Sequence, residues 1–263
     1  MPDFLSEVAA STRSLISQGY YSLTKSPSKR RHIDLKASIA RTKSSNVTPV
    51  IAELKPKSPS LGSINPEANP GLAPVLEKAG ACAISVLVEP RYFGGSLSLL
   101  SASASSVSVP VLFKDFVVSK KQIEAASEAG ADLLLMIAEL FEIGACDTSL
   151  EKMVDYAKDM GLQVLLEFHD INLVRTVLES SADYVGVNNR DLHNLTLDPA
   201  YFERVSEHLR DGRIIVAESG YTSREQILKH ASLGADAFLI GSSIMASQNP
   251  AEKLRELAHG HPD

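Results

Sequence analysis

Cysteine is scarce in this chain. Among 263 residues only Cys82 and Cys146 are cysteines, and they lie far apart in the sequence. Two such residues provide neither a disulfide framework nor the ligand spacing of a zinc site. We therefore expect a protein of a reducing compartment, the cytoplasm, and no metal site built on cysteine.

Positive charge and long apolar runs are scarce as well. The chain has 26 Lys and Arg against 32 Asp and Glu, for a net charge of −6, and it contains no long basic stripe. This balance argues against a nucleic-acid partner. The first residues, with Asp3 and Glu7, lack the apolar core of a signal peptide, and no run approaches the length that spans a bilayer. We expect no membrane partner, and an anionic ligand would need a local cluster of donors.

What the chain does contain is a repeated pattern: a helical segment, a break at a small residue, then a short apolar run. Examples are "LEKAGACAISVLVEP", "ASEAGADLLLMIAEL" and "ASLGADAFLIGSS". Apolar runs without polar alternation are typical of strands buried on both faces, as in a parallel sheet covered by helices. The runs lie at 50–55, 82–89, 110–114, 132–138, 163–169, 184–189, 214–219 and 237–243. Ser119 and Ser223 are the expected N-caps of two intervening helices.

Eight β–α units in a chain of this length predict an α/β protein with a (β/α)8 barrel. A doubly wound open sheet is the structural alternative. It usually needs fewer strands and carries a G-x-G-x-x-G phosphate loop after its first strand, and this sequence has no such loop. The pattern favours the barrel.

The first residues do not belong to the repeat. We expect residues 1–48 to form an N-terminal helical extension and residues 49–263 to form the barrel as a single catalytic domain. "FLSEVAASTRSLISQGYYS" and "IDLKASIART" have helical spacing, and "TKSPSKRRH" between them has the composition of a solvated turn. The extension could cap the bottom of the barrel or lean over its mouth, and the sequence leaves both possibilities open.

Ionisable residues gather where the predicted strands end. Glu53 and Lys55 end the first run, and Lys114, Glu167 and Glu218 end the third, fifth and seventh. Active sites of such barrels form at the carboxyl ends of the strands. Any one of these residues could belong to a salt bridge that closes the barrel, but buried ion pairs rarely stabilise more than apolar replacements do. Burial at such a mouth can lower the pKa of lysines and raise that of carboxyls, as proton transfer near neutral pH requires.

The seventh and eighth runs end in a second pattern, "ESGYTS" and "LIGSS". Gly220 and Gly241 allow a ligand to approach the backbone closely, and Ser219 and Ser242 add hydroxyl groups. This is the usual phosphate position of a (β/α)8 barrel, after strands seven and eight. The alternative is that both glycines only form tight turns.

Taken together, the segments resemble one enzyme family. "IAELKPKSPSLG", "AISVLVEPRYFGGS", "VLFKDFVV", "LLEFHD", "VGVNNRDL", "AESGY" and "LIGSS" resemble, in order and spacing, those of indole-3-glycerol phosphate synthase. The resemblance covers nearly the whole chain. It implies ring closure, decarboxylation and dehydration of 1-(2-carboxyphenylamino)-1-deoxyribulose 5-phosphate to indole-3-glycerol phosphate, CO2 and water, in tryptophan biosynthesis.

The resemblance also implies roles for individual residues. Lys114 resembles the family's general acid, Glu167 its partner carboxylate, and Lys55 a lysine that contacts the substrate and takes part in proton transfer. Further catalytic-pocket residues are Glu53, Asn188, Glu218 and Ser219, and the residues expected to hold the substrate and its phosphate are Ser58, Phe93, Arg190, Gly220, Gly241 and Ser242. Phe168 is bulkier than the family pattern suggests, but we expect its side chain to point away from the mouth.

This set of groups suits the chemistry. A cation near the ketone oxygen stabilises the charge that develops as the carbon–carbon bond forms. A general acid then helps a hydroxyl to leave, while a base removes a proton to restore aromaticity. Lysines and carboxylates supply these needs, so we expect no cofactor and no metal. We expect a monomer, with a weak homodimer as the alternative.

Three other functions are alternatives for this sequence. A Schiff-base aldolase on the same barrel would use Lys114 or Lys55 as its nucleophile. Phosphoribosylanthranilate isomerase, another barrel enzyme, needs a cysteine–aspartate pair, and neither cysteine here ends a strand. A catalytically inactive phosphate-binding scaffold would be favoured if Lys55, Lys114 or Glu167 were missing, and all three are present.

Overall fold

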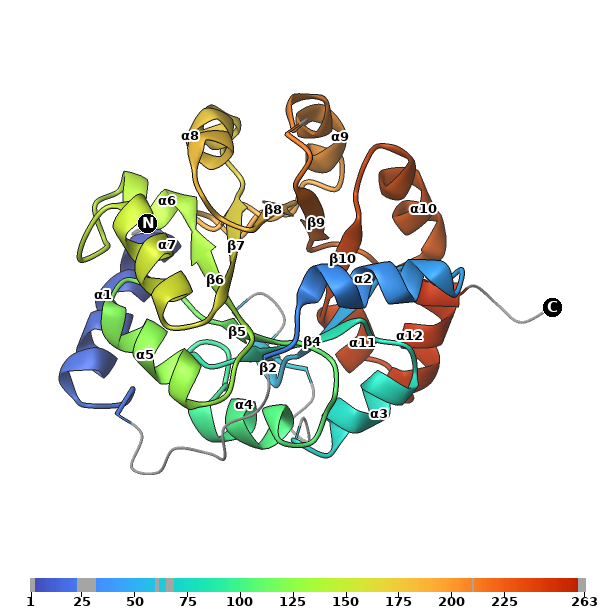
Figure 1. The fold of residues 1–263 in the computed structure, drawn as a ribbon, viewed down its shortest axis with the longest axis horizontal. Helices are drawn as coiled ribbons and strands as arrows, with labels where there is room; N and C mark the ends of the chain where they lie inside the picture. Colours follow the sequence, from blue (N-terminus) through green and yellow to red (C-terminus); the bar gives the residue numbers. More distant parts are fainter. Residues whose placement is uncertain (1–2, 23–31, 60–61, 65–68, 210, 260–263) are drawn as a thin grey trace.

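The computed structural model describes residues 3–22, 32–59, 62–64, 69–209 and 211–259. Within them, eight parallel strands close into a barrel that helices surround, which confirms the predicted (β/α)8 architecture (Figure 1). All but the last residue of the predicted turn at 24–32 lie outside the described residues. The barrel strands are β1 (Val50–Leu54), β4 (Ala83–Leu87), β5 (Val111–Lys114), β6 (Leu133–Ile137), β7 (Gln163–Phe168), β8 (Tyr184–Asn188), β9 (Ile214–Glu218) and β10 (Ala237–Ile240).

Each barrel strand lies inside the apolar run that predicts it and is up to three residues shorter. The order around the barrel is β1-β10-β9-β8-β7-β6-β5-β4, and β1 closes it by pairing with both β4 and β10. In this register Ile51 lies opposite Ala83 on one side and Leu239 on the other. A small antiparallel hairpin of β2 (Lys57–Ser58) and β3 (Gly62–Ser63) follows β1.

Helices follow the strands and cover the outside of the barrel. They are α3 (Leu72–Lys78), α4 (Leu97–Ala104), α5 (Lys120–Glu128), α6 (Ala138–Glu142), α7 (Leu150–Asp159), α8 (Val174–Glu179), α9 (Tyr201–Val205), α10 (Arg224–Ser232), α11 (Ser242–Met245) and α12 (Pro250–His259), with 3-10 turns η1 (Ile171–Leu173) and η2 (Ser206–His208). The predicted N-caps are confirmed: Ser119 and Ser223 each form a capping box with the glutamine three residues later.

Side chains alternate along each strand between the barrel interior and the helical layer. In β1, Ile51 belongs to the interior cluster, whereas Ala52 and Leu54 pack against the helices. The same period of two places Leu112 inside and Phe113 outside in β5. A residue two positions after the last interior apolar residue of a strand points to the same side. Its side chain therefore lies at the mouth of the barrel.

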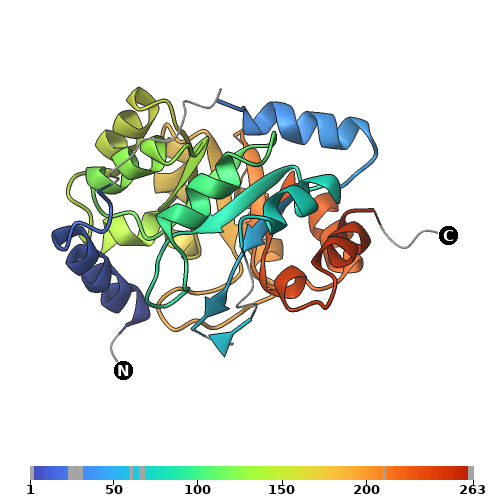
Figure 2. The same cartoon turned by 90° about the horizontal axis from the view of Figure 1, so that it is seen from below.

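The second helix of the N-terminal extension closes the bottom of the barrel. Helix α2 (Leu35–Ser44) begins beside residues that precede or start strands: the Ile33 N–H donates to Asp132 at 2.8 Å and the Leu35 N–H to Gln163 at 3.0 Å. The Ser38 hydroxyl donates to the Cys82 carbonyl at 2.6 Å. Figure 2 shows α2 and the β2–β3 hairpin on opposite sides of the molecule.

The first helix lies at the other end. Helix α1 (Phe4–Ser17) contacts loops that leave the carboxyl ends of strands: its Phe4 N–H donates to His193 in the loop after β8 at 2.9 Å. The Tyr92 hydroxyl donates to Glu7 at 2.7 Å, and the Phe4 ring packs edge-on against Tyr92 and Phe116. Both positions that the sequence left open are therefore occupied, each by one helix.

Asp132 connects α2 to the barrel, so its loss should destabilise the fold without touching the mouth. Its buried carboxylate accepts from the N–H groups of Ile33 and Val111, both at 2.8 Å. We expect Asp132→Ala to leave both donors without their acceptor and to cost about 2 kcal/mol or more, a fall of several degrees in Tm.

Thermal unfolding followed by circular dichroism measures this effect. Asp155→Ala, at an exposed position of α7, is the matched control and should leave Tm nearly unchanged. An Asp132→Ala protein as stable as this control would contradict the role of Asp132.

Candidate active site

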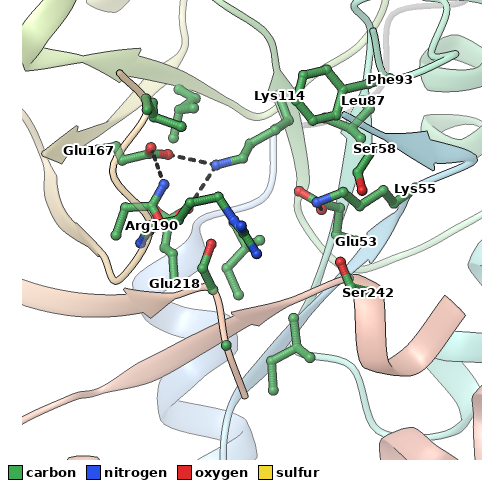
Figure 3. A pocket seen from close by; sticks show the side chains of 18 of the residues that line it. Glu53, Lys55, Ser58, Leu87, Phe93, Lys114, Glu167, Arg190, Glu218 and Ser242 are labelled. Atoms are coloured by element: carbon green, nitrogen blue, oxygen red, sulfur yellow. Dashed lines mark hydrogen bonds and ion pairs between the residues drawn. The ribbon is translucent and has the colours of Figure 1, made fainter. Parts of the chain in front are cut away.

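A cavity of about 390 Å³ opens at the carboxyl end of the barrel. This volume lies in the range of small-molecule sites. Every residue that the sequence predicts for the site lines this cavity, and most are drawn in Figure 3. They are Glu53, Lys55, Ser58, Phe93, Lys114, Glu167, Asn188, Arg190, Glu218, Ser219, Gly220, Gly241 and Ser242.

Lys114 lies at the centre of the ionisable groups. Its Nζ is 2.7 Å from a carboxylate oxygen of Glu167 on β7 and 2.7 Å from one of Glu218 on β9 (Figure 3). Both carboxylates are about 1% exposed. The other oxygen of Glu167 accepts from Nδ2 of Asn188 at 2.6 Å. Three strands thus bring one ammonium group between two buried carboxylates.

This arrangement shifts the pKa values of the lysine and the two glutamates in different directions. Burial disfavours the charged form of Lys114, but Glu167, Glu218 and Glu53 outweigh it and raise the pKa of the lysine far above its ordinary value. Burial also opposes ionisation of Glu167, yet Lys114 and Asn188 lower its pKa. For Glu218, burial together with the charge of Glu167 outweighs Lys114 and raises the pKa to about 8. The expectation of a lowered lysine pKa is wrong for Lys114, and that of a raised carboxyl pKa holds for Glu218 but not for Glu167.

The second lysine lies on a different wall of the cavity. Lys55 Nζ is 3.3 Å from Glu53 Oε1 and lies over the Phe93 ring, 5.7 Å from its centroid. The pair expected at the end of β1 is therefore formed. Gly241 makes room for it, because a Cβ at this position would lie 2.4 Å from Glu53 Oε1.

The serines and glycines of the site come from strand β2 and from the turns after β9 and β10. Figure 3 shows Ser58 and Ser242 flanking the Lys55–Glu53 pair. Ser219 and Gly220 have positive φ values of 67° and 87°, so the backbone turns sharply at the end of β9. A positive φ is common for glycine but unfavourable for serine, and such strain is concentrated at functional sites.

The apolar part of the cavity was not predicted from the sequence, except for Phe93. It includes side chains from strands, from the loop after β5 and from the loop after β8: Leu87, Phe116, Leu135, Ile137, Leu192, Leu195, Leu197, Leu239 and Ile240. The strand phase could have identified Leu135, Ile137 and Leu239, which share the interior face with the charged residues. The loop leucines carry no such periodic signal.

Several polar residues at the mouth hold loops in place. Arg190 donates from its guanidinium to the Leu195 carbonyl at 2.7 Å, and burial lowers the pKa of this guanidinium. Glu89 accepts the N–H groups of Tyr92 and Phe93 at 2.6 and 3.0 Å, which fixes the loop that carries the Phe93 ring. His169 donates from Nδ1 to the Asn188 carbonyl at 2.7 Å and lies outside the cavity lining. Phe168 packs in the helical layer, as expected.

The raised pKa of Glu218 predicts a pH dependence of stability. The folded state binds the Glu218 proton up to about pH 8, whereas an unfolded glutamate releases it near its ordinary pKa of 4.5. The stabilisation is thus complete below pH 4.5 and is lost as the pH rises towards 8. Glu218→Gln has no such proton, so the Tm of the parent protein should fall relative to that of the variant between about pH 5 and 8.

Differential scanning calorimetry of both proteins in a series of buffers measures this difference. Asp115, whose pKa burial raises to about 7, is present in both proteins and cancels in the comparison. Parallel Tm curves for the two proteins would show that Glu218 is already ionised at neutral pH.

The described residues contain no helix that is long and apolar enough to cross a membrane. Nor do they include a group of three or more His, Cys, Asp or Glu side chains that could hold a metal ion.

Solved structures with the same fold are distant in sequence. Thiamine phosphate pyrophosphorylase from Pyrococcus furiosus matches with a TM-score of 0.58 at 13% identity, covering 80% of this chain and 93% of that chain. A mandelate oxidase matches with a TM-score of 0.57 at 17% identity, covering 80% and 70%. At such identities the likeness shows the fold alone.

Sequence comparison is more specific. The family model described as indole-3-glycerol phosphate synthase matches residues 6–257. Proteins of that name from Aquifex aeolicus (strain VF5) and Beutenbergia cavernae are 40% and 42% identical over 213 and 216 residues, covering 80% and 81% of this chain and 81% and 78% of theirs. The one from Methanocaldococcus jannaschii is 38% identical and covers 87% of this chain and 84% of its own. With its buried lysine–carboxylate cluster at the barrel mouth, the chain belongs to the indole-3-glycerol phosphate synthase family.

Proposed function

We propose that this protein converts 1-(2-carboxyphenylamino)-1-deoxyribulose 5-phosphate to indole-3-glycerol phosphate, CO2 and water, and that the residues at the barrel mouth carry out the reaction. The observation that carries the assignment of roles is the position of Lys114, 2.7 Å from both Glu167 and Glu218 at the wall of an otherwise largely apolar cavity. Such a cluster can supply charge and protons to a substrate that excludes water from the same cavity.

Ring closure needs a cation near the ketone. The ring carbon that bears the carboxylate attacks the ketone carbon, the ketone oxygen gains negative charge, and departure of CO2 then restores the benzene ring. We assign charge stabilisation to Lys114 and Lys55, whose ammonium groups reach the cavity from different walls. A lysine held as a cation before the substrate arrives needs no reorganisation when charge develops on the oxygen.

Dehydration needs a proton donor for the leaving hydroxyl and a base for the proton that is lost from the newly closed five-membered ring. We assign the donor to Lys114 and the base to Glu167, as the family resemblance implies. Glu218, with a pKa of about 8, can carry the proton that Lys114 must regain at the end of each turnover. Its carboxylate touches Lys114 directly, so this transfer needs no intervening group.

The two ends of the substrate then have different partners. Phe93 and the leucine-rich wall receive the aromatic ring, and Ser58, Ser219, Gly220 and Ser242 receive the phosphate. For Gly241 we propose an indirect part: its missing side chain leaves room for Glu53, which in turn holds Lys55. Asn188 orients Glu167, and Arg190 supports the loop that carries part of the apolar wall.

The aldolase alternative is weaker for Lys114. A Schiff base forms from a neutral amine, and two carboxylates keep this lysine protonated. Borohydride trapping in the presence of the carbonyl substrate separates the two mechanisms, because stable labelling of a lysine would support the aldolase.

We further propose that the reaction needs no cofactor, that the chain acts as a monomer in the cytoplasm, and that residues 49–263 form the catalytic domain with residues 1–48 as its extension. The experiment that tests the activity is incubation of the purified protein with the carboxyphenylamino-deoxyribulose phosphate in metal-free buffer. Indole fluorescence should appear with time, and its absence would overturn the assignment.

Lys114→Ala should reduce turnover by about 10²–10⁴-fold, since a positioned acid is lost from a water-poor cavity. The measurement is the initial rate of indole fluorescence, with circular dichroism as the check on folding. Activity of the folded variant within a few-fold of the parent would contradict the role of Lys114.

Glu167→Gln separates proton transfer from charge balance. The amide keeps the size of the side chain but cannot take up a proton, so kcat should fall by about 10²-fold or more while KM changes much less. Both constants should be measured from acid to alkaline pH. If Glu167 only neutralises Lys114 in the empty site, the variant will keep near-normal turnover at a shifted pH optimum.

A further inference from the structure

The turn after β9 adjoins two cavities. Gly220 and Tyr221 line the main cavity of about 390 Å³, and they also line a second one of about 210 Å³ beside α9 and α10. Close packing fixes most of a protein interior, but side chains surround this turn only in part. Its backbone is also unfavourable, because Ser219 has a φ of 67°. Something other than packing must therefore hold it.

Asn189 supplies the first restraint. It is 1% exposed and follows Asn188, whose side chain faces Glu167, but its own side chain turns away from the main cavity. Its Nδ2 donates to the Ser219 carbonyl at 3.1 Å and to the Tyr221 hydroxyl at 3.3 Å. Its Oδ1 accepts the Phe202 N–H at 3.0 Å, so α9 fixes the amide in turn.

Tyr221 and His230 supply the second restraint. The Tyr221 hydroxyl lies 2.7 Å from Nδ1 of His230, a 4% exposed residue of α10 whose ring stacks on Phe202 with centroids 5.0 Å apart. Since Asn189 donates to the hydroxyl oxygen, the hydroxyl proton is available for Nδ1, and the ring proton then lies on Nε2, 3.6 Å from Glu203. Burial lowers the pKa of His230, which keeps this neutral form.

We propose that Tyr221 and His230 are positioning residues: together with Asn189 they hold the Ser219–Gly220 turn in the geometry that receives the phosphate of the substrate. The proposal rests on the phosphate position assigned above. The Tyr221 hydroxyl and His230 act through the turn and not on the substrate, because the partners of the hydroxyl, Asn189 and His230, are outside the lining of the main cavity. Their loss should therefore weaken substrate binding more than it slows the reaction.

Tyr221→Phe tests this directly. It removes one hydroxyl group and keeps the ring, which packs edge-on against Phe238 with centroids 5.0 Å apart. Loss of the two hydrogen bonds of this hydroxyl, with Asn189 and His230, should raise KM about three- to tenfold and leave kcat within about twofold. Inhibition by inorganic phosphate, measured as a competitive inhibition constant, should weaken by the same factor.

Histidine variants test the pair. His230→Ala should raise KM by up to the same factor, and combining it with Tyr221→Phe should add little, because both changes remove the hydrogen bond between Tyr221 and His230. His230→Asn keeps an acceptor near the position of Nδ1 and should restore most of the affinity. Additive effects of the two changes, or no rescue by asparagine, would overturn the pairing.

Tyr184→Phe is the matched control. This tyrosine at the bottom of the barrel also has a bonded hydroxyl, which accepts from Gln163 at 2.6 Å and from the Lys36 N–H at 3.3 Å. The control should lower Tm and leave KM unchanged. If Tyr221→Phe behaves in the same way, its role is structural only and the proposal is wrong.

Ser242→Asp tests the position of the phosphate separately from the positioning role of Tyr221. The added negative charge should raise KM strongly if the phosphate binds there. A large effect of Ser242→Asp with none of Tyr221→Phe would overturn the positioning role alone. An unchanged KM in both would show that the phosphate binds elsewhere, and the proposal would fall with the site.

Discussion

One buried ammonium group governs the arrangement of the barrel mouth. Removing Lys114 from water is costly, and the cost is offset only because Glu167 and Glu218 both lie 2.7 Å from its Nζ. The two carboxylates in turn repel each other unless the lysine or a proton lies between them. Strands β5, β7 and β9 must therefore end in a fixed register, and each of the three residues depends on the other two.

Within this cluster two chemically identical side chains acquire different properties. Asn188 donates to Glu167 at 2.6 Å, whereas Oε1 of Glu218 receives no hydrogen bond from a donor in the described part of the chain. The ionised form is thus favoured at Glu167, and the proton is retained at Glu218. Gly186 permits this proximity, since a Cβ there would lie 2.6 Å from Glu218 Oε1. A base and a proton reserve can in this way arise from one residue type.

The barrel and the polar residues of the site could be predicted from the sequence, because both follow from short-range patterns. Apolar runs locate the strands, and charged residues at the ends of several strands, such as Lys55 and Glu218, indicate a site because buried ion pairs rarely stabilise a fold more than apolar residues do. The direction of the pKa shifts could not be predicted, because it depends on which carboxylate Lys114 and Asn188 meet across the barrel. The loop part of the apolar wall could not be predicted, because Leu195 and Leu197 come from a loop, where no periodicity marks the side that faces the cavity.

The position of the N-terminal extension on the barrel could not be predicted from the sequence either. Its helical spacing predicts two helices, but their docking depends on partners far along the chain: Asp132 and Gln163 for α2, and His193 for α1. Helix α2 and the residues just before it bond to residues at the start of several strands and so restrain the bottom of the barrel. Helix α1 ties together loops that carry Phe93 and Leu192 on the mouth side. The extension thus restrains both ends of the barrel through residues that do not line the cavity.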